Sequence, residues 1–588
     1  MRKTIAFLSK TGLAAGILAV AICCKPTAHI SFSPDTQWKF RTGNDLAWAD
    51  PHTDDSLWDT LSITTCWEEQ GYPGYDGYAW YRKEITLPED FARSVTYYKG
   101  LEVRYENADD ADALYFNSRY IGRTGDFPPN YKSAYGLERS YVVPLAYIHT
   151  DAPNTIAIKV YDDGGEGGLL TPSVTLWPVT PAPVIETQAH VLAEDGVFKE
   201  NEPHRIHLTV RNPEESRRKV HVRMSVSTDD HKPVSQKTYK AGLRPQAGMT
   251  WEESIQLQGP GFYRCSLFVT ASGHHLEPVA FNFGCEPEKI TSVPDAPENM
   301  DAFWEETRTL LNAVPMQAKV KLLPEHSRGP RNVYRVDMQS FGHETIGGYY
   351  AVPKKRGKHP VLMTFMGYGS NPWIPKSEED PDFITFVVSV RGQGIYKAGN
   401  KYHNQWFISG LESKETYYYR GAYMDLVRAL DFVCSRAEAD TDRICAQGAS
   451  QGGAFTLALC ALDDRVAVAA PSIPFMSDFP VYFNIVDWPA SEMDAYLRLF
   501  PEITKEDLYK ILSYFDIKNL ALRITAPTIM AVGLQDEICP PRTNFAGYNA
   551  ITAPKEYKVY KENSHSTPAQ WQEVRMAFFT EHLERLQP

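Results

Sequence analysis

Basic residues are in the minority in this sequence. Its 588 residues include 60 Lys and Arg against 73 Asp and Glu, so the formal net charge at pH 7 is −13. Proteins that bind nucleic acid neutralise phosphates with clustered Lys and Arg. This charge balance therefore excludes nucleic acid as the expected partner.

Cysteine is scarce and widely scattered. Two of the nine cysteines, Cys23 and Cys24, are adjacent near the N-terminus, and the other seven are Cys66, Cys265, Cys285, Cys434, Cys445, Cys460 and Cys539. An odd number at wide spacing excludes a disulfide framework, and no two have the short spacing of zinc ligands. We expect most of them to be small buried side chains. Cys265 and Cys285 are the pair that could form a disulfide within one domain.

The N-terminus lacks an apolar run long enough to span a bilayer comfortably. Arg2 and Lys3 precede an uncharged, mostly apolar run over Thr11–Ile22, which favours an export signal within residues 1–28. Cys23 and Cys24 stand where a bacterial lipoprotein carries its lipidated cysteine, and cleavage near Ala28 is the alternative. Either signal predicts export to the periplasm, the cell surface or the medium. Membrane attachment is expected only through such a lipid.

The chain is too long for one hydrophobic core, and residues 30–180 read as β-rich. Strand-like runs over Tyr78–Ile85, Ala113–Phe116 and Thr155–Tyr161 are separated by Gly, Pro, Asn and Asp. The stretch Trp67–Arg82 and the later run Asp112–Gly122 resemble the galactose-binding-like jelly-roll domain of family-two glycoside hydrolases. The resemblance implies a domain that either contacts carbohydrate or acts as a spacer.

A Pro-rich hinge leads from this domain to a second β-rich region. The hinge contains Pro172, Pro178, Pro181 and Pro183, and residues 184–290 follow it. Polar and apolar residues alternate over Arg205–Val210, Val220–Val226 and Phe262–Ala271. This alternation predicts a small β-sandwich with one face of each sheet in a core, and no catalytic chemistry is evident in it.

Residues 291–588 change to alternating strands and helices. Asp295 is the expected cap of a first helix, in which apolar residues recur at helical spacing from Met300 to Val314. A later helix is expected over Tyr423–Ser435. Near-continuous apolar runs predict buried parallel strands over His359–Phe365, Phe383–Val390, Arg443–Ala446, Val466–Ala470 and Thr528–Val532. The predicted fold is therefore multidomain: a jelly roll and a β-sandwich, both all-β, followed by an α/β-hydrolase domain.

The motif Gly448-Ala-Ser-Gln-Gly452 matches the nucleophile elbow G-x-S-x-G. It follows the strand-like run Arg443–Ala446 and precedes an apolar helix over Phe455–Leu462, which is the strand–turn–helix setting that the motif requires. Glycines let the backbone turn sharply there. Ser450 is thus the predicted nucleophile.

A serine hydroxyl needs a base, and in this fold the partners follow in the order Ser, acid, His. His565 lies in a polar loop after the strand Tyr557–Tyr560, whereas His582 lies in a helical tail, so His565 is the predicted base. Asp536 follows the strand Thr528–Val532 and is the predicted acid that orients the imidazole. Its neighbour Glu537 is the rival.

Two backbone N–H groups are expected to form the oxyanion hole. Gln451, directly after the nucleophile, supplies one of them. Tyr368, in the loop Gly367-Tyr-Gly369 after an earlier strand, is predicted to supply the other, although its ring could serve only for packing.

Several ordered motifs of the last 300 residues resemble one family. They are Arg391-Gly-Gln-Gly394, Tyr418-Tyr-Arg-Gly421, Gly448–Gly453, Leu512–Asp516 and Gly533–Pro541. This part is similar to the acetyl xylan esterase and cephalosporin C deacetylase family, carbohydrate esterase family seven. The resemblance implies removal of acetyl groups from sugar hydroxyls, with Arg391 and Gln393 as structural supports near the site.

Two features depart from that family. Ser566 follows His565, where the family usually carries Glu, and two β domains precede an enzyme that elsewhere forms hexameric rings. The oligomeric state is therefore left open.

The predicted function is a serine carbohydrate esterase acting on acetylated plant polysaccharides or oligosaccharides through an acyl-enzyme, with no metal or organic cofactor. A peptidase of the same fold and a carbohydrate-binding protein with a vestigial esterase domain are the alternatives.

Overall fold

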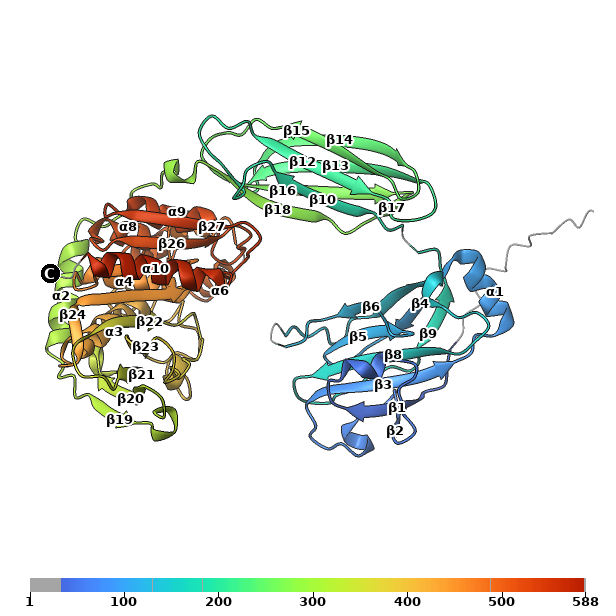
Figure 1. The fold of residues 1–588 in the computed structure, drawn as a ribbon, viewed down its shortest axis with the longest axis horizontal. Helices are drawn as coiled ribbons and strands as arrows, with labels where there is room; N and C mark the ends of the chain where they lie inside the picture. Colours follow the sequence, from blue (N-terminus) through green and yellow to red (C-terminus); the bar gives the residue numbers. More distant parts are fainter. Residues whose placement is uncertain (1–32, 129–130, 182, 487, 586–588) are drawn as a thin grey trace, which may run out of the picture. The chain divides into compact units, whose positions relative to one another are not determined.

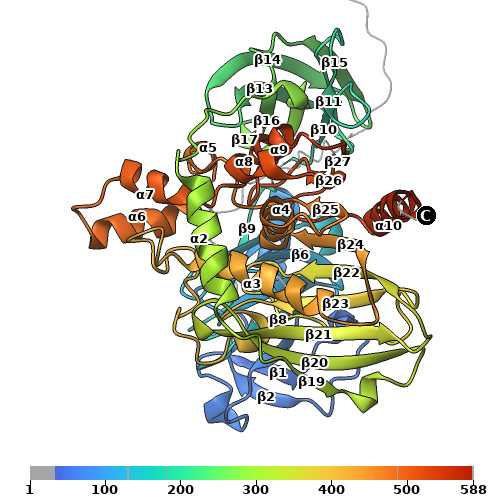
Figure 2. The same cartoon turned by 90° about the vertical axis from the view of Figure 1, so that its left-hand side faces the viewer.

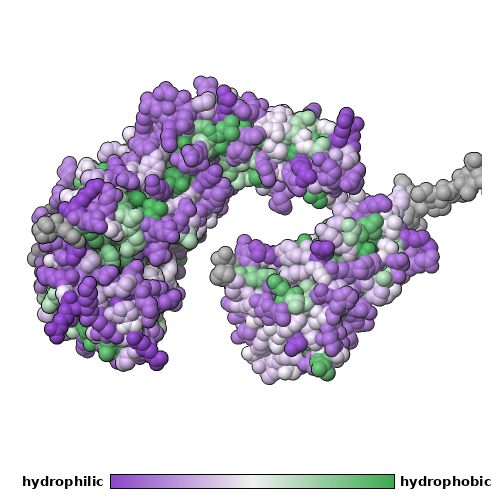
Figure 3. All heavy atoms as spheres, in the orientation of Figure 1, coloured by the Kyte–Doolittle hydropathy of each residue, from purple (hydrophilic) through white to green (hydrophobic). Residues whose placement is uncertain are grey.

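The computed structural model describes residues 33–128, 131–181, 183–486 and 488–585, and the predicted export signal lies outside them. The chain divides into two compact units, Met1–Ala182 and Pro183–Pro588 (Figure 1). Polar residues cover most of the face shown in Figure 3. Over the described residues, no helix has the length and apolar character needed to cross a membrane.

The first unit consists of two antiparallel sheets, as the sequence predicted for an all-β domain. The six-stranded sheet has the order β2 (Asp59–Ser62), β1 (Gln37–Thr42), β3 (Gly77–Ile85), β8 (Asn154–Asp162), β5 (Ala111–Phe116) and β6 (Arg119–Thr124). The three-stranded sheet has the order β7 (Arg139–Pro144), β4 (Gly100–Tyr105) and β9 (Thr175–Pro178), and α1 spans Glu89–Tyr98. Large rings such as Trp38, Trp67 and Tyr81 are buried in the shared core.

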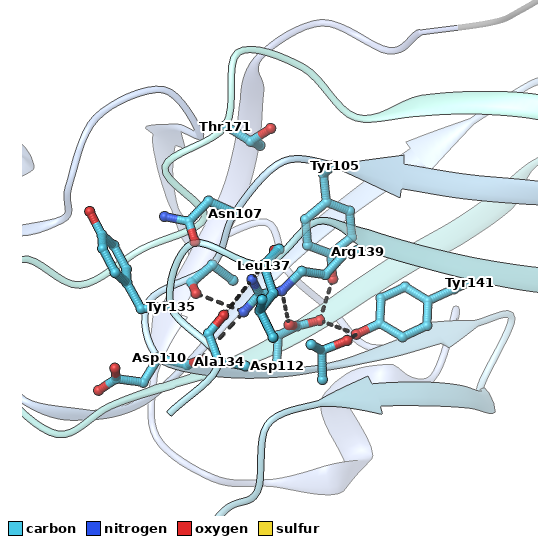
Figure 4. Close-up of polar contacts among 12 residues, drawn as sticks. Tyr105, Asn107, Asp110, Asp112, Ala134, Tyr135, Leu137, Arg139, Tyr141 and Thr171 are labelled. Carbon is cyan, nitrogen blue, oxygen red and sulfur yellow. Dashed lines mark hydrogen bonds and ion pairs between the residues drawn. The ribbon is translucent and has the colours of Figure 1, made fainter. Parts of the chain in front are cut away.

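A charged network is buried in the same unit (Figure 4). The fully buried Arg139 donates from Nε to Asp112 Oδ1 at 2.7 Å and from Nη1 to the Ala134 carbonyl at 2.9 Å. Asp112 also accepts hydrogen bonds from the hydroxyls of Tyr105 and Tyr141. Because both charges are paired and hydrogen-bonded, removal of either partner would leave an uncompensated buried charge.

The second unit begins with a β-sandwich. One sheet has the order β10 (Glu186–Val191), β12 (Arg205–Arg211) and β15 (Gly248–Ser254). The other has the order β11 (Val197–Phe198), β18 (Val279–Cys285), β16 (Gly261–Ala271), β13 (Arg218–Thr228) and β14 (Pro233–Leu243), with β17 (His274–His275) paired to β16. Residues that alternate along these strands, such as Val220, Val222, Met224 and Val226, are fully buried, as the sequence pattern predicted.

The suggested Cys265–Cys285 disulfide is wrong. The seven cysteines that the structure describes are free, and six of them are buried. Cys265 lies opposite Phe281 in the ladder between β16 and β18, whereas Cys285 lies opposite Gly261. The two cysteines are thus four positions apart along neighbouring strands, roughly 13 Å, which no disulfide can bridge.

A nine-stranded sheet forms the rest of this unit. Its order is β19 (Lys319–Leu322), β20 (Arg331–Gln339), β21 (Thr345–Pro353), β23 (Ile384–Ser389), β22 (His359–Phe365), β24 (Ala439–Ala449), β25 (Val468–Ser472), β26 (Thr528–Gly533) and β27 (Lys555–Tyr560). The neighbouring strands β23, β22, β24, β25, β26 and β27 pair in parallel. The strands β19, β20 and β21 pair antiparallel at one side of the sheet, and β21 pairs antiparallel with β23.

Helices cover both faces of this sheet. Val361, Met363 and Phe365 of β22 belong to the core shared with α2 (Met300–Asn312), α3 (Tyr418–Cys434) and α4 (Gln451–Leu462). Leu362, between them, belongs instead to the core under α10 (Gln570–Glu584). Figure 2 shows α3 and α10 on opposite sides of the sheet. The predicted α/β-hydrolase fold with a doubly covered parallel sheet is confirmed. The remaining helices are α5 (Phe479–Tyr482), α6 (Ala490–Leu499), α7 (Lys505–Leu512), α8 (Ile517–Leu520) and α9 (Pro541–Ala550).

Two local expectations are wrong in this domain. Asn299, and not Asp295, precedes α2, because Asp295 accepts a hydrogen bond from Asn519 at 2.8 Å and pairs with Lys518 at 3.1 Å. The helix expected from Tyr423 starts earlier, at Tyr418, since the rings of Tyr418 and Tyr419 are buried in the core.

The β-sandwich packs directly on the nine-stranded sheet within the same unit. Phe262 of β16 and Ile290 share an apolar cluster with Met530 and Val532 of β26 and with Phe545 of α9. The Asn549 side chain adds hydrogen bonds to the carbonyls of Pro287 and Ile290. The sandwich therefore contacts the strand that leads into the loop carrying Asp536.

Candidate active site

Ser450 lies at the sharp turn between β24 and α4. Its backbone angles, φ 59° and ψ −121°, lie in a strained region that non-glycine residues rarely adopt. A Cβ on Gly448 would lie 2.4 Å from the Gly452 carbonyl oxygen, and one on Gly452 would lie 2.2 Å from the Phe365 carbonyl oxygen. Only glycine fits at both positions, so the motif is required by backbone packing as well as by the turn.

The turn is held by backbone hydrogen bonds on both sides of the serine. Ser450 N–H donates to the Ser472 carbonyl at 3.0 Å, and Phe475 N–H donates to the Ser450 carbonyl at 3.1 Å. The Ser450 side chain lies beside the Cys539 thiol. Burial, reinforced by the charge of Asp536, raises the pKa of that thiol well above its usual range, so Cys539 stays protonated.

Asp536 and His565 are in direct contact. His565 Nδ1 lies 2.9 Å from Asp536 Oδ2 and 3.1 Å from Oδ1. Asp536 is buried, with 2% of its surface exposed, and Oδ1 also accepts hydrogen bonds from the N–H groups of Ile538 and Cys539, each at 2.8 Å. A carboxylate held in this way accepts a hydrogen bond from Nδ1–H and leaves Nε2 free to act as a base.

The alternative acid, Glu537, and the other histidine after Ser450, His582, have different partners. The Glu537 side chain is 71% exposed and pairs with Arg264 at 3.0 Å. His582 Nδ1 contacts the Phe578 carbonyl within α10 at 3.0 Å.

The loops that carry the acid and the histidine are packed against each other. Gln535 N–H donates to the Asn563 carbonyl at 2.9 Å, and Leu534 N–H donates to the Tyr560 carbonyl at 3.1 Å. A Cβ on Gly533 would lie 2.1 Å from the Ser564 carbonyl oxygen. Among the described residues, no hydrogen bond joins the Ser450 hydroxyl to His565, whose side chain is 25% exposed.

Two glutamine side chains connect the loop of Tyr368 to the start of α4. Gln393 and Gln451 exchange two hydrogen bonds, at 3.1 and 3.0 Å, and Gln393 Oε1 also accepts from Gly369 N–H at 3.0 Å. The Tyr368 ring lies against Trp406 and Trp488, and its hydroxyl accepts from Phe407 N–H. In the part of the chain that the structure describes, the backbone N–H groups of Tyr368 and Gln451 donate to no acceptor. Both remain available to an anion.

Comparison with known proteins agrees with this geometry. The family model of acetyl xylan esterase (AXE1) matches residues 288–583. The chain belongs to the acetyl xylan esterase family. It is therefore a carboxylic ester hydrolase, and the family predicted from the motifs is confirmed.

Individual acetyl esterases and acetyl xylan esterases are similar to about half of the chain. Acetyl esterase Axe7A of Xylanibacter ruminicola is 27% identical over 341 residues, which cover 56% of this chain and 76% of that protein. The acetyl xylan esterase from Paenibacillus sp. R4 is 32% identical, with a TM-score of 0.47, over 50% of this chain and 98% of that one. Acetyl xylan esterase 1 from a Thermoanaerobacterium species is 30% identical, with the same TM-score and coverage.

In this esterase, Arg391 supports the loop that carries Gln393. Its guanidinium forms two hydrogen bonds with Asp425, at 2.8 and 2.7 Å, and its backbone N–H donates to the same carboxylate at 3.0 Å. A Cβ on Gly421 would lie 2.1 Å from Arg391 Nη1, so the glycine lets the guanidinium pack on α3. Arg391 and Asp425 are both buried, which suits a structural ion pair.

The esterase also receives contacts at this site that no sequence pattern indicated. The Gln535 side chain pairs with the backbone of Asn282 in β18: its Oε1 accepts from Asn282 N–H at 2.7 Å, and its Nε2 donates to the Asn282 carbonyl at 3.0 Å. Gln535 Nε2 also donates to the Lys561 carbonyl at 2.8 Å. The β-sandwich therefore holds the residue next to Asp536. Because the partners are about 250 positions apart, no local motif could have revealed this contact.

Proposed function

We propose that this chain removes O-acetyl groups from plant polysaccharides or oligosaccharides, acetylated xylan among them, through a serine acyl-enzyme. The observation that carries the proposal is the buried Asp536 carboxylate bound to His565 Nδ1, with Ser450 at the adjoining elbow. Membership of the acetyl xylan esterase family supports the acetyl substrate.

In the first step, Ser450 Oγ attacks the acetyl carbonyl carbon while His565 Nε2 takes its proton. The imidazolium that forms is stabilised by Asp536, which keeps its negative charge. The carbonyl oxygen becomes an oxyanion, and the N–H groups of Tyr368 and Gln451 donate hydrogen bonds to it. The hydrogen bonds between Gln393 and Gln451 hold the two N–H donors in position relative to each other.

In the second step, the tetrahedral intermediate collapses to acetyl-Ser450, and His565 protonates the departing sugar oxygen. A water molecule then gives a proton to His565 Nε2 and attacks the acetyl carbon. His565 returns its proton to Ser450 Oγ as the bond from Oγ to the acetyl carbon breaks, and acetic acid leaves and loses its own proton to the solvent. These steps require no metal or organic cofactor.

The place of action follows from the N-terminal residues. We infer an exported enzyme, periplasmic, lipid-anchored or secreted, from the basic start and apolar run of residues 1–28. Acetylated plant glycans are extracellular polymers, so export would bring the enzyme to its substrate.

The direct test is release of acetate from acetylated xylan and from nitrophenyl acetate. Ser450→Ala should lower kcat by at least about 10⁴-fold on both substrates. Ser435→Ala is the matched control, because Ser435 follows α3 at the end of the sheet opposite Ser450, and its activity should be unchanged. Retained hydrolysis by a correctly folded Ser450→Ala variant would refute the proposal.

A further inference from the structure

Three carboxylates of the first unit converge at one end of its six-stranded sheet. One oxygen from each of Asp109, Asp110 and Asp162 lies within 4.8 Å of the others. Asp109 and Asp110 precede β5, and Asp162 is the last residue of β8, the strand that pairs with β5. Ala111 lies opposite Tyr161 in that ladder, so the register itself brings Asp110 beside Asp162.

The cluster is held in place by surrounding backbone and side-chain groups. Asp110 accepts from Ser133 Oγ at 2.5 Å and from Asp163 N–H at 3.1 Å. Asp162 Oδ1 accepts from Gly164 N–H at 2.8 Å, and Asp109 N–H donates to the Gly168 carbonyl at 2.9 Å. Asp110 is also hydrogen-bonded to Tyr131 and to Asp109, so the three carboxylates are ordered by groups of their own unit.

A second observation, an unpartnered buried oxygen, points to a cation as the ligand of this cluster. Asp162 is fully buried, yet its Oδ2 has no hydrogen-bond partner among the described residues. No Lys or Arg side chain within the described ranges forms an ion pair with any of the three. Arg139, the basic residue nearby, is committed to Asp112, and Figure 4 shows the Asp110 carboxylate pointing away from it. Buried carboxylates are normally paired or coordinate a metal.

We propose that Asp109, Asp110 and Asp162 bind a divalent cation, Ca²⁺ in preference to Mg²⁺ or Zn²⁺. Carboxylate oxygens are hard donors that suit Ca²⁺, and the set contains no His or Cys to favour Zn²⁺. A buried, irregular cluster fits the flexible coordination of Ca²⁺ better than the strict octahedron of Mg²⁺, which retains most of its water.

The bound ion would join the turn before β5 to the end of β8. It would replace mutual repulsion among three carboxylates by attraction to a shared cation, and so stabilise the first unit. All three residues lie in the unit that does not contain Ser450, so this role is independent of the esterase reaction.

The test uses the full chain after treatment with EGTA and removal of the chelator. Calorimetric titration with CaCl₂ should give one site per chain, with a dissociation constant on the order of 10 μM to 1 mM. Tb³⁺ should show luminescence sensitised by the neighbouring Tyr131 and Tyr161, and Ca²⁺ should displace it. Ca²⁺ should also raise the unfolding temperature of the first unit.

Asp162→Asn keeps the size of the side chain and removes its charge, so it should weaken Ca²⁺ binding at least tenfold. Asp109→Asn should also weaken Ca²⁺ binding at least tenfold, and Asp109 is the more exposed of the two residues. Asp151→Asn, an exposed acid of the same unit, is the control and should bind as the parent does. In EGTA, Asp162→Asn should be at least as stable as the parent, because a buried unpaired charge is gone.

Absence of binding to the parent chain would overturn the proposal. So would unchanged binding in the folded Asp109→Asn and Asp162→Asn variants. Tighter binding of Mg²⁺ or Zn²⁺ than of Ca²⁺ would overturn the choice of ion.

Discussion

At the scale of single residues, the choice between Asp536 and Glu537 decides how His565 is oriented. Asp536→Asn should leave the fold intact and lower kcat by roughly 10⁴-fold, because the amide nitrogen donates a hydrogen bond to Nδ1 where the carboxylate accepted one, and the imidazole is then held in the wrong tautomer. Glu537→Gln is the matched control and should stay near full activity, since Glu537 faces Arg264. Initial rates on nitrophenyl acetate for both purified variants test this. The reverse pattern would assign the acid to Glu537.

Order along the chain was enough to predict that Asp536 and His565 come together. Asp536 follows the buried strand β26 and His565 follows the edge strand β27, and neighbouring parallel strands bring their carboxyl ends to one edge of the sheet. Other features of the site could not be read from the sequence. Cys539 contacts Ser450, and Gln393 pairs with Gln451, through contacts between residues far apart in the chain.

At the scale of elements, β18 holds the loop that carries the acid. Gln535→Ala should remove the side-chain hydrogen bonds to Asn282 and Lys561, and the loop should become less well ordered. We expect kcat to fall about tenfold with little change in KM, since Asp536 orients the base and does not bind substrate. Steady-state kinetics and the unfolding temperature should be measured together.

Arg264→Ala provides the comparison for this contact. It removes an ion pair to the exposed Glu537 carboxylate and a 3.2 Å hydrogen bond to the Asn282 side chain, but it leaves the hydrogen bonds between Gln535 and the Asn282 backbone in place. Exposed pairs contribute little. Its kcat should therefore stay within about twofold of the parent. An equal loss of kcat in Gln535→Ala and Arg264→Ala would show that the ordering of the loop does not depend specifically on Gln535.

Elements with strong local patterns were predicted well, and those shaped by distant contacts were not. The strand His359–Phe365 has the predicted bounds, because its mostly apolar run ends just beyond it, at Met366 before Gly367. The antiparallel strands β19–β21 were not predicted. β19 is exposed along its whole length, and the start of β21 contains Gly347 and Gly348, so neither shows a strand pattern. Asp295 is a residue type that often caps helices, but its carboxylate binds the distant side chains of Asn519 and Lys518 instead.

At the scale of the whole molecule, the contact between the β-sandwich and the hydrolase fold contains a buried acid. The Asp229 side chain is 11% exposed, its oxygens have no hydrogen-bond partner among the described residues, and Arg542 is 3.5 Å away. Burial raises the pKa of Asp229 to about 6, against the opposing effect of Arg542. Between about pH 4 and pH 6, Asp229 is protonated in the folded chain and ionised in the unfolded chain, so folding takes up a proton. The contribution of protonated Asp229 to the free energy of unfolding is therefore fully present below about pH 4 and is lost as the pH rises above about 6.

Asp229→Asn should remove this dependence on pH. The variant should gain up to about 3 kcal/mol at pH 8 relative to the parent and little at pH 4. Denaturant unfolding at the two pH values measures the difference. A variant that is less stable at pH 8 would show that the ion pair with Arg542 outweighs the burial of Asp229.

Division into two units predicts which parts of the chain the chemistry needs. Residues 183–588 contain the elbow, Asp536 and His565, so this fragment should hydrolyse nitrophenyl acetate at close to the parent rate. A shorter fragment that begins at residue 291 should lose activity or aggregate. It lacks Phe262 and Ile290, so part of the apolar cluster on β26 and α9 becomes exposed, and it also lacks the partner of Gln535. Normal activity of the shorter fragment would contradict this role of the sandwich.

The proposed acyl-enzyme mechanism requires that Ser450 is the group that is acylated. The full-length enzyme should be treated with an organophosphonate that reacts with activated serines, and the site of the adduct should be mapped by mass spectrometry. We predict one adduct per chain, on Ser450, with loss of hydrolysis in proportion to labelling. Labelling should be absent in Ser450→Ala and strongly slowed in His565→Ala. An adduct on another residue, or full hydrolysis by a chain labelled at Ser450, would contradict the account.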